Sequence, residues 1–162
     1  MILGLLYKIV HPGKPVPYWW NRSLLGEMWH LTRKFICQNI APNCVTNFMR
    51  IRLYRLCGFK IGRGGFIGMK CYFDDLCYDK IEIGNNVVIS YGVYFACHGR
   101  KQKHHRITIK DGAYIGMRAS IIAPKGDVEI GEGAIVGAMT LVNKSVPSGR
   151  TAVGVPCKVL EK

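Results

Sequence analysis

The feature that most constrains this chain is a six-residue period in its second half. Aliphatic or aromatic residues, several of them followed by glycine, recur every six positions in four separate runs. The repeated positions are Ile61, Ile67, Ile83, Ile89, Phe95, Ile109, Ile115, Ile121, Ile130, Val136 and Val142. An amphipathic helix would repeat every 3.6 residues and a half-buried strand every two. A period of six is typical of a parallel β-helix.

In such a β-helix each six-residue unit supplies one short strand and one tight corner, and three units close a triangular coil. The aliphatic residue points to the axis, where it stacks on its copies in the neighbouring coils. The position after it lies at a crowded corner, which favours glycine. At about 18 residues per coil, the last hundred residues predict roughly five coils. We therefore expect a mainly β domain over residues 58–162.

Residues 1–57 form an N-terminal segment of different character. The sequence "HPGKPVP" separates a short first element from two stretches with helical spacing, 18–40 and 45–57. We expect an α-helical cap that covers the open end of the β-helix and protects its exposed edge. The segment is also basic and contains Trp19, Trp20 and Trp29. Peripheral contact with an anionic membrane surface is therefore the alternative role for it.

Charge and cysteine content limit the partners and the compartment. The formal net charge is +13, and residues 1–60 hold nine Lys or Arg against one acid, Glu27. This excess fits a nucleic acid, an anionic membrane or an anionic substrate. No nucleic-acid-binding module is recognisable, so no nucleic-acid partner is expected. The seven cysteines contain no CxxC pair, which predicts reduced thiols in a cytoplasmic protein; Cys97 is expected to be a small buried filler.

The six-residue register is interrupted once in a way that suggests chemistry. Phe95 and Ile109 are fourteen positions apart, where two units would need twelve, so "HGRKQKHHR" must leave the coil as a loop. His98 stands where the strand before this loop ends. Loops held by a rigid scaffold are where reactive side chains are usually placed. A loop histidine without any special role is the alternative.

The repeats and the C-terminal motif resemble those of a known family. The stretches "IRLYRLCGFKIGRGGFIG", "IEIGNNVVISYGVYFACH", "ITIKDGAYIGMRASI" and "VEIGEGAIVGAMTLVNKSVPSGRTAVGVPCKVL" resemble the left-handed β-helix acyltransferases that carry the hexapeptide repeat. The resemblance covers residues 45 to 160 and is closest to the sugar O-acetyltransferases. It implies a left-handed coil, a homotrimer with active sites between subunits, and acetyl-CoA as acyl donor without any metal.

The resemblance also implies roles for individual residues near the loop. His98 matches the general base of the family, here in a "CH" pair instead of "TH" or "SH". Asp74 and Asp75 are the nearest acidic candidates for orienting its ring, and Asp75 is the one that we name for this role. Met117 follows a glycine where family members place a backbone N–H near the thioester oxygen. Such a donor would stabilise a developing oxyanion.

Further positions are implied for the two substrates. The residues matched to the coenzyme A groove are Tyr114, Met117, Ala138, Asn143, Lys144 and Lys158. Lys158 matches a basic residue that can meet the 3′-phosphate of the nucleotide. The loop residues Lys103, His104 and His105 are the candidates for acceptor binding. A basic loop suits an acceptor that carries phosphate or carboxylate, such as a nucleotide sugar or an acidic saccharide; a solvated charge run on the surface is the alternative. A lipid-linked acceptor would fit a membrane contact of the N-terminal segment.

The sequence therefore predicts an acetyl-CoA-dependent O-acetyltransferase that acts on a sugar or glycan in envelope polysaccharide synthesis, in the cytoplasm or peripherally at the inner membrane face. One rival is a zinc enzyme of the carbonic-anhydrase type, with His98, His104 and His105 as ligands. Adjacent histidines in a loop are poor ligand geometry, which disfavours this rival. A second rival is a β-helix scaffold without catalytic activity.

Overall fold

The structure is a computed structural model that describes residues 2–16, 23–99 and 103–160. The chain divides into two compact units, Met1–Phe35 and Ile36–Lys162. The first unit contains the helices α1 (Ile2–Val10) and α2 (Leu24–Phe35). The second unit begins with a π-helical turn, Ile36–Ile40, and a 3-10 turn, Ala41–Asn43. These are followed by α3 (Asn47–Leu56) and by fourteen short strands. Among the described residues no helix has both the length and the apolar character needed to cross a bilayer.

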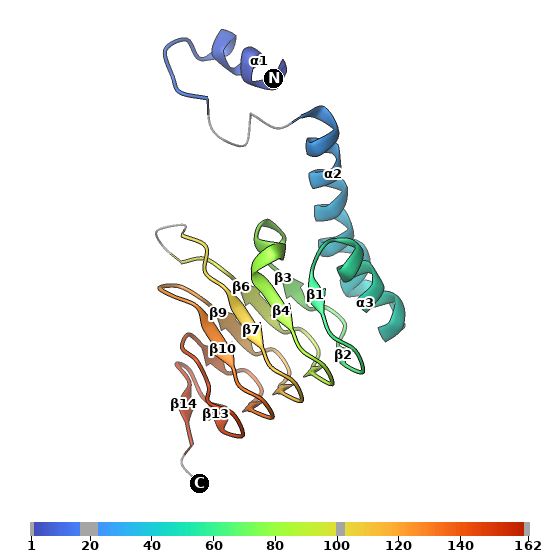
Figure 1. The fold of residues 1–162 in the computed structure, drawn as a ribbon, viewed down its shortest axis with the longest axis vertical. Coiled ribbons are helices and arrows are strands. Elements are labelled where there is room, and N and C mark those ends of the chain that lie inside the picture. Colours follow the sequence, from blue (N-terminus) through green and yellow to red (C-terminus); the bar gives the residue numbers. More distant parts are fainter. Residues whose placement is uncertain (1, 17–22, 100–102, 161–162) are drawn as a thin grey trace. The chain divides into compact units, whose positions relative to one another are not determined.

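The strands form a parallel β-solenoid with three faces, which Figure 1 shows as strands laid side by side from green to red. Each of the first four coils contributes one strand to each face. Face A consists of β1 (Lys60–Ile61), β4 (Ile81–Ile83), β7 (Ile107–Ile109) and β10 (Val128–Ile130). Face B contains β2 (Phe66–Ile67), β5 (Val88–Ile89), β8 (Tyr114–Ile115) and β11 (Ile135–Val136). Face C consists of β3 (Tyr72–Phe73), β6 (Tyr94–Ala96), β9 (Ser120–Ile122) and β12 (Leu141–Val142).

A partial fifth coil ends the solenoid. Val146 pairs in parallel with Ile130 on face A. Strand β13 (Thr151–Val153) then joins β11 in parallel on face B, and β14 (Lys158–Val159) runs back antiparallel to β13. The expectation of about five coils is therefore met by four complete coils and an incomplete one. The reversal at β14 ends the parallel stacking on face B.

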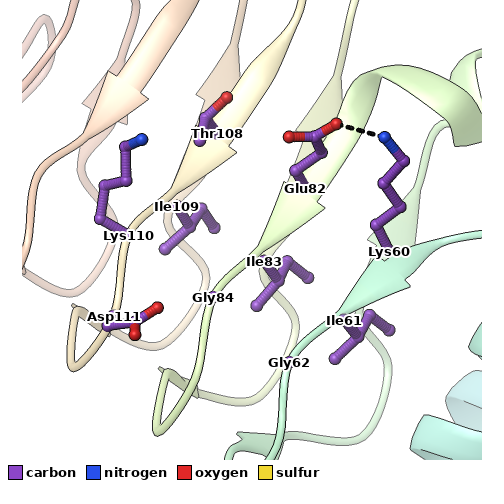
Figure 2. A pocket seen from close by; sticks show the side chains of 10 residues that line it. All are labelled: Lys60, Ile61, Gly62, Glu82, Ile83, Gly84, Thr108, Ile109, Lys110 and Asp111. Carbon is purple, nitrogen blue, oxygen red and sulfur yellow. Dashed lines mark hydrogen bonds and ion pairs between the residues drawn. The ribbon is translucent and has the colours of Figure 1, made fainter.

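The axial core consists of the residues that repeat every six positions. Figure 2 shows Ile61, Ile83 and Ile109 in one row on face A, with Lys60 and Glu82 directed toward one another on the outside. Strand pairing in parallel register places these isoleucines beside each other. Ile83 and Ile109 are buried, so their stacking supplies the apolar burial that holds the coils together. The outer side of this face carries a shallow hollow of about 480 Å³.

Helix α3 covers the exposed edge of the first coil, as the sequence predicted for a cap. Its buried Arg50 donates to the carbonyl oxygen of Ile67 (2.6 Å) and to that of Cys44. The amide of Asn47 accepts from Ile67 N–H (2.9 Å) and donates to Gly65 carbonyl (3.1 Å). These side chains satisfy backbone groups that would otherwise form an open β edge.

Aromatic side chains pack helix α3 against the core of the first coil. Tyr54 is fully buried, donates to the carbonyl of Cys71 (3.2 Å), and lies 4.5 Å from the ring of Phe73 between centroids. Helix α3 therefore belongs to the compact unit of the solenoid. The division of the sequence at residue 57 stays a prediction, and Trp19 and Trp20 lie outside the described residues.

Candidate active site

The candidate site lies at the edge between faces C and A, where the six-residue register is interrupted. Strand β6 ends at Ala96, and the buried Cys97 and the partly exposed His98 follow it. The loop returns beside its own start: His104 forms an antiparallel bridge with His98, and His105 N–H donates to Cys97 carbonyl (2.7 Å). The bulge predicted from the spacing is therefore a loop that folds back next to His98.

A buried carboxylate orients the His98 ring. Asp74 Oδ2 lies 2.9 Å from His98 Nδ1, and the same oxygen accepts the backbone N–H of Cys97 at 3.1 Å. The side chain of Asp74 is 2% exposed, whereas that of His98 is 34% exposed. With Nδ1 directed at the carboxylate, the ring keeps Nε2 for a substrate proton. This is the arrangement that a general base needs, in which a third group fixes the tautomer and the direction of the imidazole.

Coil stacking explains how Asp74 reaches His98. Asp74 follows β3 at the edge between faces C and A, and His98 follows β6 at the same edge one coil later. Because Phe73 pairs with Phe95 in parallel register, the residues after these strands are stacked on one another. The carboxylate is also the N-cap of a 3-10 helix, Asp75–Lys80, and accepts Leu76 N–H at 3.3 Å. Asp74 is therefore fixed from two sides.

Asp75, which the sequence analysis named for orienting the ring, contacts a different partner. Its Oδ1 accepts from Gln38 Nε2 at 3.1 Å, and the same amide nitrogen donates to the carbonyl of Phe73. Asp74, the neighbouring residue, is therefore the aspartate that contacts His98. Asp74 lies in extended backbone and Asp75 begins the 3-10 helix, so the two carboxylates meet different partners.

Two cysteines complete the buried side of the site. Cys77 and Cys97 are buried, and their sulfur atoms lie within 4.8 Å of each other and of an Asp74 carboxylate oxygen. A hydrogen bond with Cys77, followed by burial, raises the pKa of the Cys97 thiol far above its ordinary value. A thiol held neutral and away from solvent is not a nucleophile. Cys97 is buried as predicted and fills space behind the imidazole.

The three histidines do not form a metal-ligating cluster in the described part of the chain. The ring centroids of His98 and His104 are 6.1 Å apart at an interplanar angle of 82°. His105 Nδ1 lies 3.9 Å from Asp127 instead. In residues 2–16, 23–99 and 103–160 the one group of three or more residues whose ligating atoms all lie within 4.8 Å of one another is Asp74, Cys77 and Cys97. The geometry therefore gives no support to the three-histidine zinc site.

The remaining loop residues divide into exposed and anchored groups. Lys103 and His104 are exposed, and His104 is paired with His98 through the backbone. Arg106 is anchored: its guanidinium pairs with Glu82 at 3.0 Å, and its N–H donates to Asp127 at 2.8 Å. Arg100 and Lys101, also counted in the basic loop, lie outside the described residues. Lys103 and His104 are therefore the described loop residues that an acceptor bound at His98 could meet.

The residues matched to the coenzyme A groove occupy other places on the solenoid. Met117 and Ala138 are exposed at the edge between faces B and C, in the third and fourth coils, and Tyr114 is exposed on face B. Asn143 and Lys144 are exposed after β12, at the same edge as His98. The structure of one chain therefore does not bring His98 and Met117 together, because one face of the prism separates their edges.

A nucleotide thioester fits the chemistry of these exposed residues. Lys144 and the β14 residue Lys158 are exposed cations suited to phosphate groups. Ala138 presents a small, exposed side chain at its corner. The coils approach closely there, because a Cβ on Gly116 would meet Ala138 N at 2.5 Å. The hollow on the outer side of face A involves neither His98 nor these residues.

Comparison with known proteins supports the fold and the family. No family model matches the chain. The chain is 30% identical over 154 residues to the putative acetyltransferase YvoF of Bacillus subtilis strain 168, a match that covers 93% of this chain and 88% of that protein. It is 32% identical over 143 residues to serine acetyltransferase of Bacillus licheniformis, which covers 87% of this chain and 62% of that protein. The chain spans less than two thirds of the length of the first curated relatives that it matches.

Solved structures show the same architecture. A hexapeptide-repeat acetyltransferase of Vibrio cholerae, complexed with acetyl coenzyme A, has a TM-score of 0.67 at 20% identity over 86% of this chain and 89% of that chain. Maltose O-acetyltransferase of Clostridium difficile 630 has a TM-score of 0.62 at 24% identity over the same shares. Together with the near full-length match to YvoF and the six-residue repeat, these likenesses show that the chain belongs to the hexapeptide-repeat acetyltransferases.

Proposed function

We propose that this protein transfers an acetyl group from acetyl-CoA to a hydroxyl of a sugar or glycan, with His98 as general base. The observation that carries the proposal is the His98–Asp74 pair, a partly exposed imidazole held at 2.9 Å by a buried carboxylate. Such a pair is built to take a proton, because the buried partner stabilises the imidazolium that forms. A scaffold without activity would have no need for a carboxylate buried beside the imidazole.

The steps follow from the orientation of the ring. Bound acetyl-CoA supplies the acetyl group as an activated thioester. His98 Nε2 accepts the proton of the acceptor hydroxyl as its oxygen attacks the carbonyl carbon, and later returns that proton to the departing sulfur. Asp74 keeps Nδ1 protonated throughout. The backbone N–H of Met117 would stabilise the negative charge on the carbonyl oxygen.

The active enzyme in this proposal is a homotrimer with the site between two copies. Two features support it. His98 and Met117 lie at different edges of the prism, so they can serve one site only if they come from neighbouring copies. Face B also exposes an apolar row in register, Phe66, Tyr114 and Ile135, each 44–46% exposed. A second copy would bury this row.

The acceptor in this proposal carries negative charge. Lys103 and His104, exposed beside His98, are the groups that would recognise a phosphate or carboxylate. A glycan assembled on a lipid carrier at the cytoplasmic side of the inner membrane fits this description. L-Serine is the second candidate acceptor, because serine acetyltransferases are among the relatives.

The test is release of free thiol from acetyl-CoA by the purified full chain, measured against a panel of acceptors. The panel contains maltose, a neutral glycan, nucleotide sugars, an acidic oligosaccharide and L-serine. We expect turnover to depend on the acceptor and to be fastest with an anionic sugar. Turnover with L-serine alone would replace the sugar acceptor, and no turnover with any hydroxyl would overturn the proposal. Stoichiometric zinc in active protein would favour the carbonic-anhydrase alternative.

A further inference from the structure

The helices that precede the solenoid expose apolar side chains in ordered rows. In α2 the row is Leu24, Met28, Leu31 and Phe35, each between 53% and 64% exposed. The spacing of four, three and four residues places these side chains on one side of the helix. A row of this kind in a globular protein is normally buried against another element. In α2 it faces outward.

Helices α1 and α3 repeat the pattern. In α1 the exposed apolar residues include Leu5, Leu6 and Ile9. In α3 the inner side packs into the solenoid, while Phe48 and Met49 are 63% and 53% exposed on the outer side. Each of the three helices therefore presents its own apolar surface, whatever the placement of the first unit relative to the second.

Basic side chains accompany these apolar rows. The exposed cations include Lys8 in α1, Lys34 in α2 and Arg52 in α3. The guanidinium of Arg52 lies 4.3 Å from the ring of Phe48, which joins charge and apolar surface directly. Glu27 is the single acid in residues 1–60. Short helices with exposed apolar sides, basic residues and no capacity to span a bilayer are typical of binding in the interfacial plane.

We infer that α1, α2 and α3 bind the surface of an anionic lipid bilayer, with their apolar rows in the interface and their cations on the headgroups. Charge decides between a lipid surface and a second copy of this chain. A second copy would bring the same cations together, whereas an anionic surface neutralises them at about 1 kcal/mol, or roughly fivefold in binding, for each Lys or Arg near it. The inference concerns a surface and does not depend on the identity of the acceptor.

The experiment is co-sedimentation of the full chain with two kinds of vesicle. One is pure phosphatidylcholine, and the other contains 30 mol% phosphatidylglycerol, a mixture chosen to test the charge dependence. We expect at least tenfold tighter binding to the anionic vesicles at low salt, and a marked loss at high salt. Equal binding to both vesicles, or no binding to either, would overturn the inference.

Two single variants with matched controls locate the surface. Leu31→Ser should weaken binding about tenfold through lost apolar burial, and Lys34→Glu at least fivefold through the lost attraction. Leu160→Ser and Lys125→Glu make the same changes at exposed positions of the solenoid and should leave binding unchanged. Equal effects of variants and controls would contradict the assignment to these helices.

Two further measurements separate the alternatives. Sedimentation velocity without lipid should give the same oligomeric state for Leu31→Ser and the unsubstituted chain; dissociation of the variant would show that a second copy covers the row. Circular dichroism verifies that the variants fold. Turnover with a water-soluble acceptor should not change in either variant, so failure of membrane binding and failure of the proposed acetyl transfer give different results.

Discussion

At the edge between faces C and A, the second coil has a long loop, whereas the third and fourth coils have short corners. In the third and fourth coils the chain crosses from face C to face A through short corners, residues 123–127 and 143–145. In the second coil the crossing takes residues 97–106. The strands on either side keep the register of their neighbours: Phe95 pairs with Ile121 and Ile109 with Ile130. The extra residues therefore leave the stacking of the flanking strands undisturbed.

The long corner holds the proposed general base, His98, and it is attached to the coils on both sides. The long corner is tied to the coil beyond it, because Arg106 N–H donates to Asp127 of the next corner. It is tied to the coil before it by Asp74. His98 stands between these two attachments. A reactive side chain on a rigid scaffold at a loop is the arrangement expected of a catalytic position.

The largest effect should come from removing the imidazole. We predict that His98→Ala lowers kcat by about 10²–10⁴-fold, the usual contribution of a general base, with little change in thermal stability because the ring is partly exposed. Thiol release from acetyl-CoA measures the rate. His104→Ala, in the same loop, is the control and should raise KM for the acceptor more than it lowers kcat. Equal losses of kcat in His98→Ala and His104→Ala would contradict the separate roles of the two histidines.

The next effect concerns the two aspartates. We predict that Asp74→Asn lowers kcat on the order of a hundredfold, because a neutral amide does not stabilise the imidazolium and its NH2 group can donate to Nδ1, which favours the wrong tautomer. Asp75→Asn should keep kcat and change only the melting temperature, since its contact is with Gln38. The pH profile of kcat should shift in Asp74→Asn alone. The reverse result would restore Asp75 as the orienting residue.

A smaller effect is expected from substitutions at two glycines, Gly99 in the long corner and Gly126 in a short corner. A Cβ on Gly99 would come within 2.5 Å of the carbonyl oxygen of Pro124, whereas one on Gly126 would meet nothing within 4 Å. We predict that Gly99→Ala displaces the neighbouring His98, lowers kcat about tenfold and destabilises the fold by about 1–3 kcal/mol. Gly126→Ala should be neutral in both assays. Identical behaviour of the two variants would show that the close approach is unimportant.

The smallest effect is the pH dependence of the ion pair that anchors the loop. A hydrogen bond from Lys60, with attraction to Arg106, lowers the pKa of Glu82 below its ordinary value of 4.5. Ionised Glu82 therefore stabilises the folded state above pH 4.5, and this contribution is lost as the pH falls through the lowered pKa. We expect less than about 1 kcal/mol for such a surface pair.

Denaturant unfolding at pH 6 and at about pH 3 measures this contribution. Glu82→Gln should be less stable than the unsubstituted chain at the higher pH and should approach it at the lower one. A constant difference between the two proteins at both pH values would contradict the linkage to Glu82.

The fold could be predicted from the sequence because the repeat is dictated by burial at every coil. The aliphatic positions of the six-residue pattern from Ile67 onward, such as Ile89 and Ile115, are buried in the axis, and Ile61 in the first coil is half-buried. The cap was predictable for a related reason: an open parallel edge needs covering, and Arg50 and Asn47 provide the covering hydrogen bonds.

Asp74 was harder to predict as the orienting carboxylate, because the six-residue register is lost between the first and second coils. The 3-10 helix Asp75–Lys80 adds residues between the first and second coils, so counting in sixes from Ile67 to Ile83 fails. Pairing Phe73 with Phe95 would have placed Asp74 next to Cys97 and His98. Counting motifs along the sequence likewise does not show that His98 and Met117 lie at two different edges of the prism.

Since Asp74 and His98 occupy successive turns at one edge, the gap between them is a single strand step of about 4.8 Å along the axis. The spacing between hydrogen-bonded strands therefore fixes the separation of Asp74 and His98, and no flexible linker contributes to it. Ile109 pairs with Ile130, so residues 110–130 are one complete coil. Duplicating residues 110–130 would lengthen the prism while leaving the two side chains at their present separation.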